Sequence, residues 1–302
     1  MNVMITGASG RVGAHLLRRL AQVEGIDRIY GTYRTAPPTF ADPKVTLLQH
    51  DLAHLAPWSD LHLDSIVHAA ALRPAARCES DYANAIRTNI LGTAHMVEWA
   101  RQNGVHQFIF LSVQSVYQGD GAPFSEQSPV QVSDLYSVTK LAAEQIVATR
   151  LDSHVEHQIL RLSHVVGLRD HEDGVLGAFC RGVRDGRLMV HGDGAQTVCF
   201  LHVEDLADAV MKCLAVNPPS GIYNVSTETI GVRDLALLFQ REARSQLGLE
   251  VALCHVGGGA IRRFGLDTSK ILAATGWLPQ WPVCGVVEQL VRHITVHGHC
   301  PA

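Results

Sequence analysis

The first twenty residues combine a short apolar run, three regularly spaced glycines and an amphipathic segment. Residues 1–6 are rich in Val, Ile and Met, as in a buried strand, and Gly7, Gly10 and Gly13 follow directly. Apolar residues then recur at helical spacing, at Val12, Leu16, Leu17 and Leu20. Glycine allows a tight turn and a close backbone approach, and the free N–H groups and positive dipole of a helix start attract phosphate. This strand, turn and helix predict that a dinucleotide binds at the turn.

The size and composition are those of an ordinary globular protein. The chain has 302 residues, of which 47% are hydrophobic and 18% charged, enough for one large α/β domain or two lobes. A net charge of −4 shows no excess of basic residues, so we expect no nucleic-acid partner and no membrane partner. Because the first predicted strand begins at residue 1, we expect no signal peptide. Seven scattered cysteines without a CxxC pair indicate reduced thiols, which predicts a cytoplasmic protein.

Apolar runs alternate with helical segments through the first half of the chain. Further strands are predicted at residues 27–34, 45–52, 65–71 and 107–112, and a long helix is predicted at 82–103, capped by Gly104. Strands and helices that alternate at this spacing predict an α/β fold, a doubly wound parallel sheet of the Rossmann type. Ligands of such sheets bind outside the carboxyl ends of the strands, where the glycine turn lies.

The end of the second predicted strand bears on the choice of cofactor. In this kind of fold an acidic residue about twenty positions past the glycines binds the adenine ribose, whereas an arginine accommodates a 2′-phosphate. No acid occupies residues 31–35, and Arg34 closes the strand. The sequence therefore predicts NADP(H), with NAD as the alternative if Arg34 is only a solvated strand end.

A tyrosine and a lysine stand four residues apart, at Tyr136 and Lys140, at the start of a predicted helix. Residues four apart share a helix face. A free tyrosine has a pKa of about 10, and a cation about 5 Å away would lower it by about two units at an effective dielectric of 20. The pair therefore predicts a phenol that transfers a proton to a carbonyl oxygen while hydride moves to its carbon.

Motifs along nearly the whole chain resemble those of the extended short-chain dehydrogenase/reductase family, which contains NAD(P)-dependent sugar epimerases, dehydratases and reductases. In the first half the motifs are Gly7-x-x-Gly10-x-x-Gly13, Asp51-Leu52, His68-Ala-Ala-Ala71, Asn89 with Gly92-Thr93, Ser112-x-x-x-Val116-Tyr117 and Tyr136-x-x-x-Lys140. In the second half they are His202-Val-Glu-Asp205, Gly221-Ile-Tyr-Asn-Val225 and Gly276-Trp277-x-Pro279.

The resemblance implies a Rossmann domain over residues 1–166, to which 196–228 cross back, and a smaller C-terminal substrate lobe from 167–195 and 229–302. It implies that Tyr136 is the acid/base and that Lys140 binds the nicotinamide ribose and lowers the tyrosine's pKa. It also implies a homodimer. The residues expected to bind the cofactor are Gly7, Ser9, Gly10, Arg11, Val12, Gly13, Arg34, Asp51, Leu52, Ala69, Ala70, Ala71, Tyr136, Lys140, Ser163, His164 and Val165.

The chain departs from the family pattern just after the fifth predicted strand. The position of the family's catalytic Ser or Thr, four residues before Tyr117, holds Val113. The sugar 4,6-dehydratases follow that hydroxyl with an Asp-Glu pair, and here Gln114 and Ser115 take its place. Without two carboxylates to act as acid and base, we expect no 4,6-dehydration. Ser115 is the expected catalytic substitute for the missing hydroxyl.

A second departure concerns the substrate. The stretch Gly192-Asp-Gly194 resembles the one that supplies an arginine to a nucleotide diphosphate, but the arginine position holds Val198. Loss of a bidentate phosphate partner makes a nucleotide sugar a less expected substrate. Arg262 and Arg263 offer alternative cations for a phosphate.

These observations predict an NADP(H)-dependent oxidoreductase that interconverts a carbonyl and a secondary alcohol on a sugar or similar polar small molecule. One alternative is an NAD(P)-dependent sugar epimerase, which returns the hydride. The other is a cofactor-binding regulator that has lost catalysis, as Val113 permits. We expect no metal site, because His293, His297, His299 and Cys300 lie at a chain end without a carboxylate nearby in the sequence.

Overall fold

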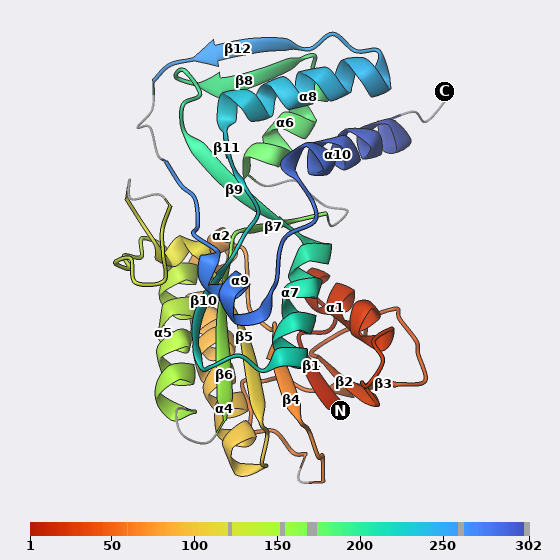
Figure 1. Cartoon of the computed structure of the whole chain (residues 1–302), viewed down its shortest axis with the longest axis vertical. Helices are drawn as coiled ribbons and strands as arrows, with labels where there is room; N and C mark the ends of the chain where they lie inside the picture. Colours follow the sequence, from red (N-terminus) through yellow and green to blue (C-terminus); the bar gives the residue numbers. More distant parts are fainter. Residues whose placement is uncertain (59, 120–122, 152–154, 168–173, 259–262, 299–302) are drawn as a thin grey trace.

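The centre of the protein is a seven-stranded parallel sheet (Figure 1). The structure is a computed structural model and describes residues 1–298 except 59, 120–122, 152–154, 168–173 and 259–262. The strands are β1 (Asn2–Thr6), β2 (Arg28–Tyr33), β3 (Val45–Gln49), β4 (Ser65–His68), β5 (Gln107–Val113), β6 (Glu156–Leu162) and β10 (Gly221–Val225). Their order is β10-β6-β5-β4-β1-β2-β3, and these neighbours pair in parallel. The doubly wound Rossmann sheet predicted from the sequence is confirmed.

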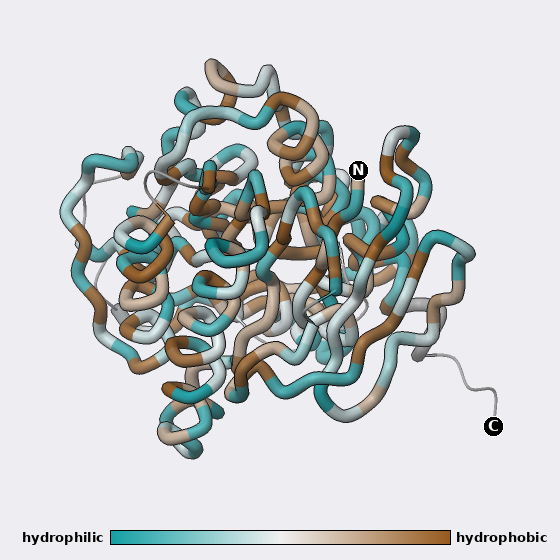
Figure 2. The backbone as a smooth tube through the Cα atoms, turned by 90° about the horizontal axis from the view of Figure 1, so that it is seen from below, coloured by the Kyte–Doolittle hydropathy of each residue, from teal (hydrophilic) through white to brown (hydrophobic). Residues whose placement is uncertain are grey.

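Alternate side chains of each strand face two different layers of helices. The helices that cover the sheet are α1 (Arg11–Ala21), α4 (Gly92–Gln102), α5 (Leu135–Arg150) and α7 (Val203–Val216). Val3 and Ile5 of β1 pack in the core with α1 and α7, whereas Met4 packs in the core with α4 and α5. A strand covered on both faces is apolar along most of its length, as Val3, Met4 and Ile5 of β1 are. Several outer helices alternate between hydrophobic and hydrophilic segments (Figure 2), as expected when one helix face is buried.

The helix predicted over residues 82–103 forms, but with a wider turn in its middle. After α2 (Ala75–Ser80), α3 (Tyr82–Ile86) leads into a π-helical turn, η1 (Arg87–Leu91), and then into α4. The buried Asn89 lies in this turn, and its Oδ1 accepts a hydrogen bond of 2.7 Å from the N–H of Leu72, in the loop after β4. Apolar periodicity does not reveal a single turn of this type. Gly104, with φ +69°, ends the segment as predicted.

The C-terminal half builds a smaller lobe beyond the sheet (Figure 1). Its elements are β7 (His164–Val166), α6 (Gly174–Arg184), β8 (Arg187–His191), β9 (Thr197–His202), β11 (Thr229–Gly231), α8 (Val232–Leu247), β12 (Ala252–Val256) and α10 (Val283–Gly298). Phe179 and Phe239 meet edge to face in its core, with ring centres 5.5 Å apart. By contrast, α9 (Ser269–Thr275) contributes Ile271 to the core of the large sheet. The domain boundaries inferred from the sequence stay a prediction.

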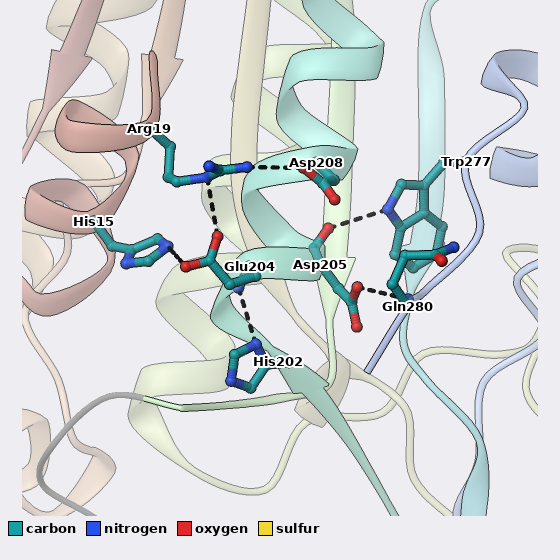
Figure 3. Close-up of polar contacts among 8 residues, drawn as sticks. All are labelled: His15, Arg19, His202, Glu204, Asp205, Asp208, Trp277 and Gln280. Carbon is teal, nitrogen blue, oxygen red and sulfur yellow. Dashed lines mark hydrogen bonds and ion pairs between the residues drawn. The ribbon is translucent and has the colours of Figure 1, made fainter. Parts of the chain in front are cut away.

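Charged side chains join α7 to the helix that follows the glycine turn (Figure 3). The carboxylate of Glu204 lies 2.9 Å from Arg19 Nε and 3.3 Å from His15 Nε2, both on α1. Arg19 Nη2 also lies 3.5 Å from Asp208. The position of α1 is therefore fixed by polar contacts as well as by the core.

The same helix end holds the chain that leads into α10 (Figure 3). The fully buried Asp205 accepts hydrogen bonds from the backbone N–H groups of Gln280, at 2.7 Å, and Trp281, at 3.1 Å. Its carbonyl oxygen accepts a third bond, of 3.1 Å, from Trp277 Nε1. Because α7 contacts α1 on one side and this segment on the other, it connects the sheet to the lobe.

Candidate active site

The predicted site residues follow the carboxyl ends of the parallel strands. In sheet order they are Ser163 after β6, Ser115 after β5, Ala69 after β4, Gly7 after β1, Arg34 after β2 and Asp51 after β3. Since these strands are parallel, their carboxyl ends lie along one edge of the sheet, which is where open α/β sheets bind their ligands. We call this band of residues the candidate site.

The glycine turn is packed so closely that side chains have no room. Gly7 has φ +69°, and a Cβ on it would lie 2.7 Å from the Cα of Ala70. A Cβ on Gly13 would lie 2.2 Å from the carbonyl oxygen of Gly7, so α1 starts directly against the turn. The N–H groups of a first helical turn have no carbonyl partner within the helix and attract anions. The turn therefore fits the pyrophosphate of a dinucleotide.

A cleft of about 220 Å³ opens between the glycine turn and the ends of β2, β3 and β4. The predicted cofactor residues that line it are Gly7, Ser9, Gly10, Arg34, Asp51, Leu52, Ala69, Ala70 and Ala71. Thr32, Tyr33, Thr35, His50, Leu72 and Thr88 complete the lining, and the sequence had not indicated them. Within the described residues, the predicted cofactor residues outside this lining are Arg11, Val12, Gly13, Tyr136, Lys140, Ser163, His164 and Val165.

A buried histidine fixes the floor of the cleft. The hydroxyl of Thr93 donates to the carbonyl of Asn89 at 2.7 Å, so it can only accept from His68 Nε2, 3.0 Å away. The other ring nitrogen then accepts from the hydroxyl of Thr6 at 2.8 Å, and the oxygen of Thr6 accepts from the N–H of Ala70 at 3.2 Å. Burial lowers the pKa of His68 to about 3. The ring is therefore neutral, as this network requires.

Tyr136 lies half-buried in the first turn of α5, packed near Leu72 of the cleft. Burial raises the pKa of Tyr136 to about 12, the guanidinium of Arg73 opposes this rise, and Cys78 and Asp134 add to it. The phenol is therefore protonated at neutral pH and can donate to a substrate oxygen.

Lys140 lies one turn further along α5 and is buried. Its Nζ lies 3.9 Å from the centre of the Phe110 ring, and burial lowers the pKa of Lys140 to about 7. The charge of Lys140 acts on His68, whereas the cation that lowers the pKa of Tyr136 is Arg73. Burial therefore raises the tyrosine's pKa where we expected a lowering, and the part of Lys140 beside a bound cofactor stays a prediction. Nothing in the sequence had indicated Arg73.

The turn after β5, η2 (Gln114–Val116), places its polar side chains in different surroundings. Gln114 is buried, and its Oε1 accepts a hydrogen bond of 3.2 Å from the thiol of Cys199. Ser115 is half-buried, with its Oγ 2.7 Å from Ser137 Oγ on α5. Ser115 thus places a hydroxyl against the first turn of α5, the turn that carries Tyr136, while its part in catalysis stays a prediction.

A buried ion pair lies beneath these residues. Arg161 of β6 donates to both carboxylate oxygens of Glu144 on α5, with the shortest contact at 2.7 Å. The hydroxyl of Ser112 donates to the same carboxylate at 2.5 Å. The guanidinium carbon of Arg161 lies 4.8 Å from the centre of the Tyr117 ring. The pair therefore connects the helix that carries Tyr136 to β5 and β6.

Residues 163–165 lead from the sheet into β7 of the lobe. Ser163 is buried and Val165 half-buried, whereas His164 is exposed. The surrounding chain nevertheless partly desolvates the imidazole of His164, which lowers its pKa, and the charge of Arg73 lowers it further. The charge of Arg73 therefore lowers the pKa of both Tyr136 and His164.

Some sequence-based expectations concern the chain away from this site. In the described residues, no helix is both long and apolar enough to cross a membrane, and no three His, Cys, Asp or Glu residues are placed to hold a metal ion. His299, Cys300 and Arg262 lie outside those residues. Val198 is half-buried on β9, beside Thr197, whose backbone pairs with that of Arg263.

Residues 3–226 match the model of the NAD dependent epimerase/dehydratase family. The chain belongs to this family. The family consists of NAD-dependent enzymes that act as epimerases or dehydratases, so the resemblance to the extended short-chain dehydrogenases/reductases is confirmed. The glycine turn is where such an enzyme would hold its dinucleotide.

Relatives in this family cover nearly the whole chain. A dTDP-glucose 4,6-dehydratase of Streptomyces antibioticus is 25% identical over 310 residues, 93% of this chain and 88% of the relative. UDP-glucuronic acid 4-epimerase from Bacillus cereus, solved in complex with NAD, has a TM-score of 0.82 at 20% identity and covers 98% of this chain and 99% of its own. MoeE5 in complex with UDP-glucuronic acid and NAD has a TM-score of 0.82 at 24% identity, with the same coverage. These likenesses establish the fold.

Proposed function

We propose that the protein is an NADP(H)-dependent oxidoreductase that interconverts a secondary alcohol and a carbonyl on a sugar or similar polar metabolite. One observation carries the proposal. A glycine turn that fits a dinucleotide and the paired hydroxyl groups beside Tyr136 lie along the same edge of one parallel sheet. Hydride transfer needs this combination, a cofactor next to groups that bind the oxygen of the reacting carbon.

Each residue of the site has a proposed part in this reaction. The cofactor supplies or takes up the hydride when it is bound at the glycine turn. The protonated phenol of Tyr136 faces the substrate oxygen as acid/base, and Ser115 is the second hydroxyl there in place of Val113. Lys140 binds the nicotinamide ribose. A hydrogen-bond donor at a developing oxyanion contributes about 2.7–4 kcal/mol, so these hydroxyls account for a large part of the catalysis.

Arg34 supports NADP(H) as the cofactor. It follows β2, is exposed and lines the cleft beside the glycine turn. No carboxylate stands at residues 31–35 to bind a ribose 2′-hydroxyl. NAD is the alternative, since the solved relatives of this fold hold NAD.

The proposal excludes 4,6-dehydration, the reaction for which several relatives are named. Gln114 and Ser115 occupy the positions of the Asp-Glu pair, and an amide and a hydroxyl cannot serve as acid and base as carboxylates do. A sugar 4-epimerase is the second candidate. It is favoured by the likeness of the whole chain to the UDP-glucuronic acid 4-epimerase with NAD.

We also propose a homodimer. Four large apolar side chains are exposed on neighbouring helices of one layer: Tyr82, Ile86, Leu91 and Val138. They belong to α3, η1 and α5. Exposed apolar side chains that gather on one face mark an interaction surface. We call this group the apolar face.

A substrate panel tests the proposed function. The full chain is incubated with NADP+ or NAD+ and with UDP-glucose, UDP-galactose, UDP-glucuronic acid, dTDP-glucose or the free sugars. Net reduction of the cofactor supports the oxidoreductase, and Tyr136→Phe should lower that rate by about 10² or more. Isomer formation without net reduction supports the epimerase. A 4-keto-6-deoxy product would overturn the exclusion of dehydration, and cofactor binding without turnover would favour a regulator.

A further inference from the structure

A histidine and an arginine follow neighbouring strands at one end of the cleft. The strands β2 and β3 pair in parallel, and the last pair of their ladder is Tyr33 and Gln49. Arg34 and His50 come directly after this pair, and both line the cleft. The N–H of His50 donates to the carbonyl of Tyr33 at 2.8 Å, and Gln49 Nε2 donates to the carbonyl of Arg34 at 3.2 Å. Because paired strands lie about 4.8 Å apart, the two side chains start from adjacent points of the cleft wall.

The contacts of His50 leave one of its ring nitrogens for a ligand. Its Nε2 lies 3.2 Å from the carbonyl oxygen of His54, and since a carbonyl can only accept, Nε2 carries a proton. The ring also meets Trp58 edge to face, with ring centres 4.9 Å apart. Among the contacts of the described residues, Nδ1 has no hydrogen-bond partner. When the ring is protonated, Nδ1 becomes a second donor and the bond to His54 is kept.

The groups around His50 determine when its ring is charged. Partial burial has the largest effect and lowers the pKa of His50, while the contact with the carbonyl of His54 and the charge of Asp51 raise it. The imidazole of His54 and that of His95, on α4, lower it. Arg34 is the further charge at this end of the cleft. The pKa lies below its usual value as a result, so the ring is neutral at pH 7 unless an anion binds beside it.

The 2′-phosphate of NADP(H) is an anion that would lie at this end of the cleft. An arginine after the second strand of a dinucleotide-binding sheet accommodates that phosphate, and Arg34 stands there. Arg34 is exposed and forms no ion pair with a carboxylate of the described residues. A phosphate monoester has a charge of about −1.5 to −2 at pH 7 and three acceptor oxygens, more than one guanidinium neutralises. A protonated His50 would supply a second donor and a second positive charge.

We infer that His50 binds the 2′-phosphate of NADP(H) together with Arg34 and takes up a proton when it does so; this inference rests on the proposed function. Binding and protonation are coupled, because the phosphate favours the proton on Nδ1 and the proton strengthens the contact with the phosphate. The contribution of His50 to NADP(H) affinity therefore grows as the pH falls. NAD(H) has a hydroxyl at the 2′ position and draws no such contribution.

Three variants separate the charge of His50 from its packing. His50→Gln keeps an N–H donor for the carbonyl of His54 but has no charge at any pH. His50→Lys provides a positive charge that does not depend on pH in this range. His54→Gln is the matched control, because its side chain is exposed and outside the cleft lining, and its backbone carbonyl remains as the acceptor for His50.

Calorimetric titration of the full chain with NADP+ and NAD+ at pH 5.5 and pH 8 measures the effect. At pH 5.5 we expect wild type to bind NADP+ about tenfold more tightly than His50→Gln, as for one charge-assisted contact. At pH 8 the two should agree within about twofold, and His50→Lys should bind NADP+ about tenfold more tightly than either. The NAD+ affinities should not differ between these proteins, and His54→Gln should behave as wild type. The phosphate itself titrates at about pH 6, so each comparison is made at one pH.

The number of protons taken up on binding is the second measurement. Titrations in two buffers of different ionisation enthalpy give this number at about pH 6.5, close to the ordinary pKa of a histidine. We expect wild type to take up more protons than His50→Gln with NADP+, and the same number with NAD+. Equal proton uptake with NADP+ in the two proteins would overturn the inference.

The outcomes distinguish this inference from the proposed function. If wild type prefers NADP+ but His50→Gln matches it at both pH values, His50 has no part and Arg34 alone selects the cofactor. If wild type binds NADP+ and NAD+ equally at every pH, the 2′-phosphate is not recognised, and both the assignment of NADP(H) and this inference are wrong. A His50→Gln variant that weakens both cofactors alike would show that the ring only packs, which also overturns the inference. The titrations need no sugar, so a failure to oxidise any panel sugar would contradict the oxidoreductase alone.

Discussion

At the scale of single residues, the surroundings of Lys140 disfavour the positive charge of its side chain. The side chain is 3% exposed, its Nζ contacts the face of Phe110, and its pKa is about 7. A lysine in water has a pKa of about 10.4. Folding therefore shifts the proton equilibrium of this one residue by several units, and the shift must be visible in the pH dependence of stability.

We predict that the free energy of unfolding of the wild type rises between about pH 7 and 8.5 more steeply than that of Lys140→Met. In this range the unfolded chain keeps the lysine proton and the folded chain, with a pKa of about 7, loses it, so stability increases with pH. A difference of one bound proton between the two states changes the free energy of unfolding by about 1.4 kcal/mol per pH unit. Between about pH 7 and 8.5 we therefore expect Lys140 to add about 1–2 kcal/mol to it. Urea unfolding at both pH values measures it.

Other shifted groups contribute equally to the wild type and to Lys140→Met, so they cancel when the two slopes are compared. The pKa of His68 is about 3 in the fold, so its contribution rises with pH and is nearly complete by about pH 7.5. The pKa of Tyr136 is about 12, so its stabilising contribution is lost only above about pH 10. Equal slopes in wild type and Lys140→Met would show that Lys140 stays charged in the fold.

Arg34 carries the second prediction at this scale. Arg34→Ala should weaken NADPH binding by about 1.5–3 kcal/mol, the loss of a charge-assisted contact to the 2′-phosphate, and should leave NADH binding unchanged. Arg28→Ala is the matched control, an exposed arginine at the opposite end of β2. Titration of both cofactors against the three proteins measures the effect. Equal wild-type affinity for NADPH and NADH contradicts the assignment.

At the scale of elements, the Glu144–Arg161 pair holds α5 against β6. Glu144→Ala leaves the Arg161 charge, 2% exposed, without its carboxylate, and we predict a loss of about 3–5 kcal/mol in the free energy of unfolding. The double change Glu144→Leu with Arg161→Met should recover most of this loss, because it removes both buried charges. Chemical denaturation of the three proteins tests this. A double variant as unstable as Glu144→Ala would point to packing, not charge.

The sequence predicts elements here better than it predicts contacts between them. Apolar runs and helical spacing located β1 to β5 and the helix that carries Tyr136, because these patterns depend on neighbours in the chain, whereas β6 and β10 were not predicted as strands. The cap of α5 by Asp134 is also a local pattern, an acidic residue before a helix. The bond between Ser115 and Ser137 and the charge of Arg73 near Tyr136 join segments distant in the sequence. No local pattern reports such contacts, so the sequence did not indicate Arg73 or the pairing of Ser115 with Ser137.

At the scale of the whole molecule, the two helical layers of the sheet differ in what covers them. The layer of α1 and α7 is joined to the lobe through Asp205 and the segment at Trp277. The layer of α4 and α5 carries the apolar face on its outer side. Large exposed apolar side chains cost free energy in water unless a partner covers them. A second copy of the chain would bury the face of both protomers at once.

The last prediction follows from this difference. Ile86→Glu places a charge within the apolar face, at a side chain that is 42% exposed, so the folded protomer should tolerate it. In a dimer the same carboxylate would be buried without a partner, which costs several kcal/mol and should convert the protein to a monomer at micromolar concentration. Leu272→Glu, on α9 and 41% exposed, is the matched control and should leave the dimer intact. Light scattering with size-exclusion chromatography distinguishes the two masses. A wild-type monomer, or a dimer that Ile86→Glu does not dissociate, would place the association surface elsewhere.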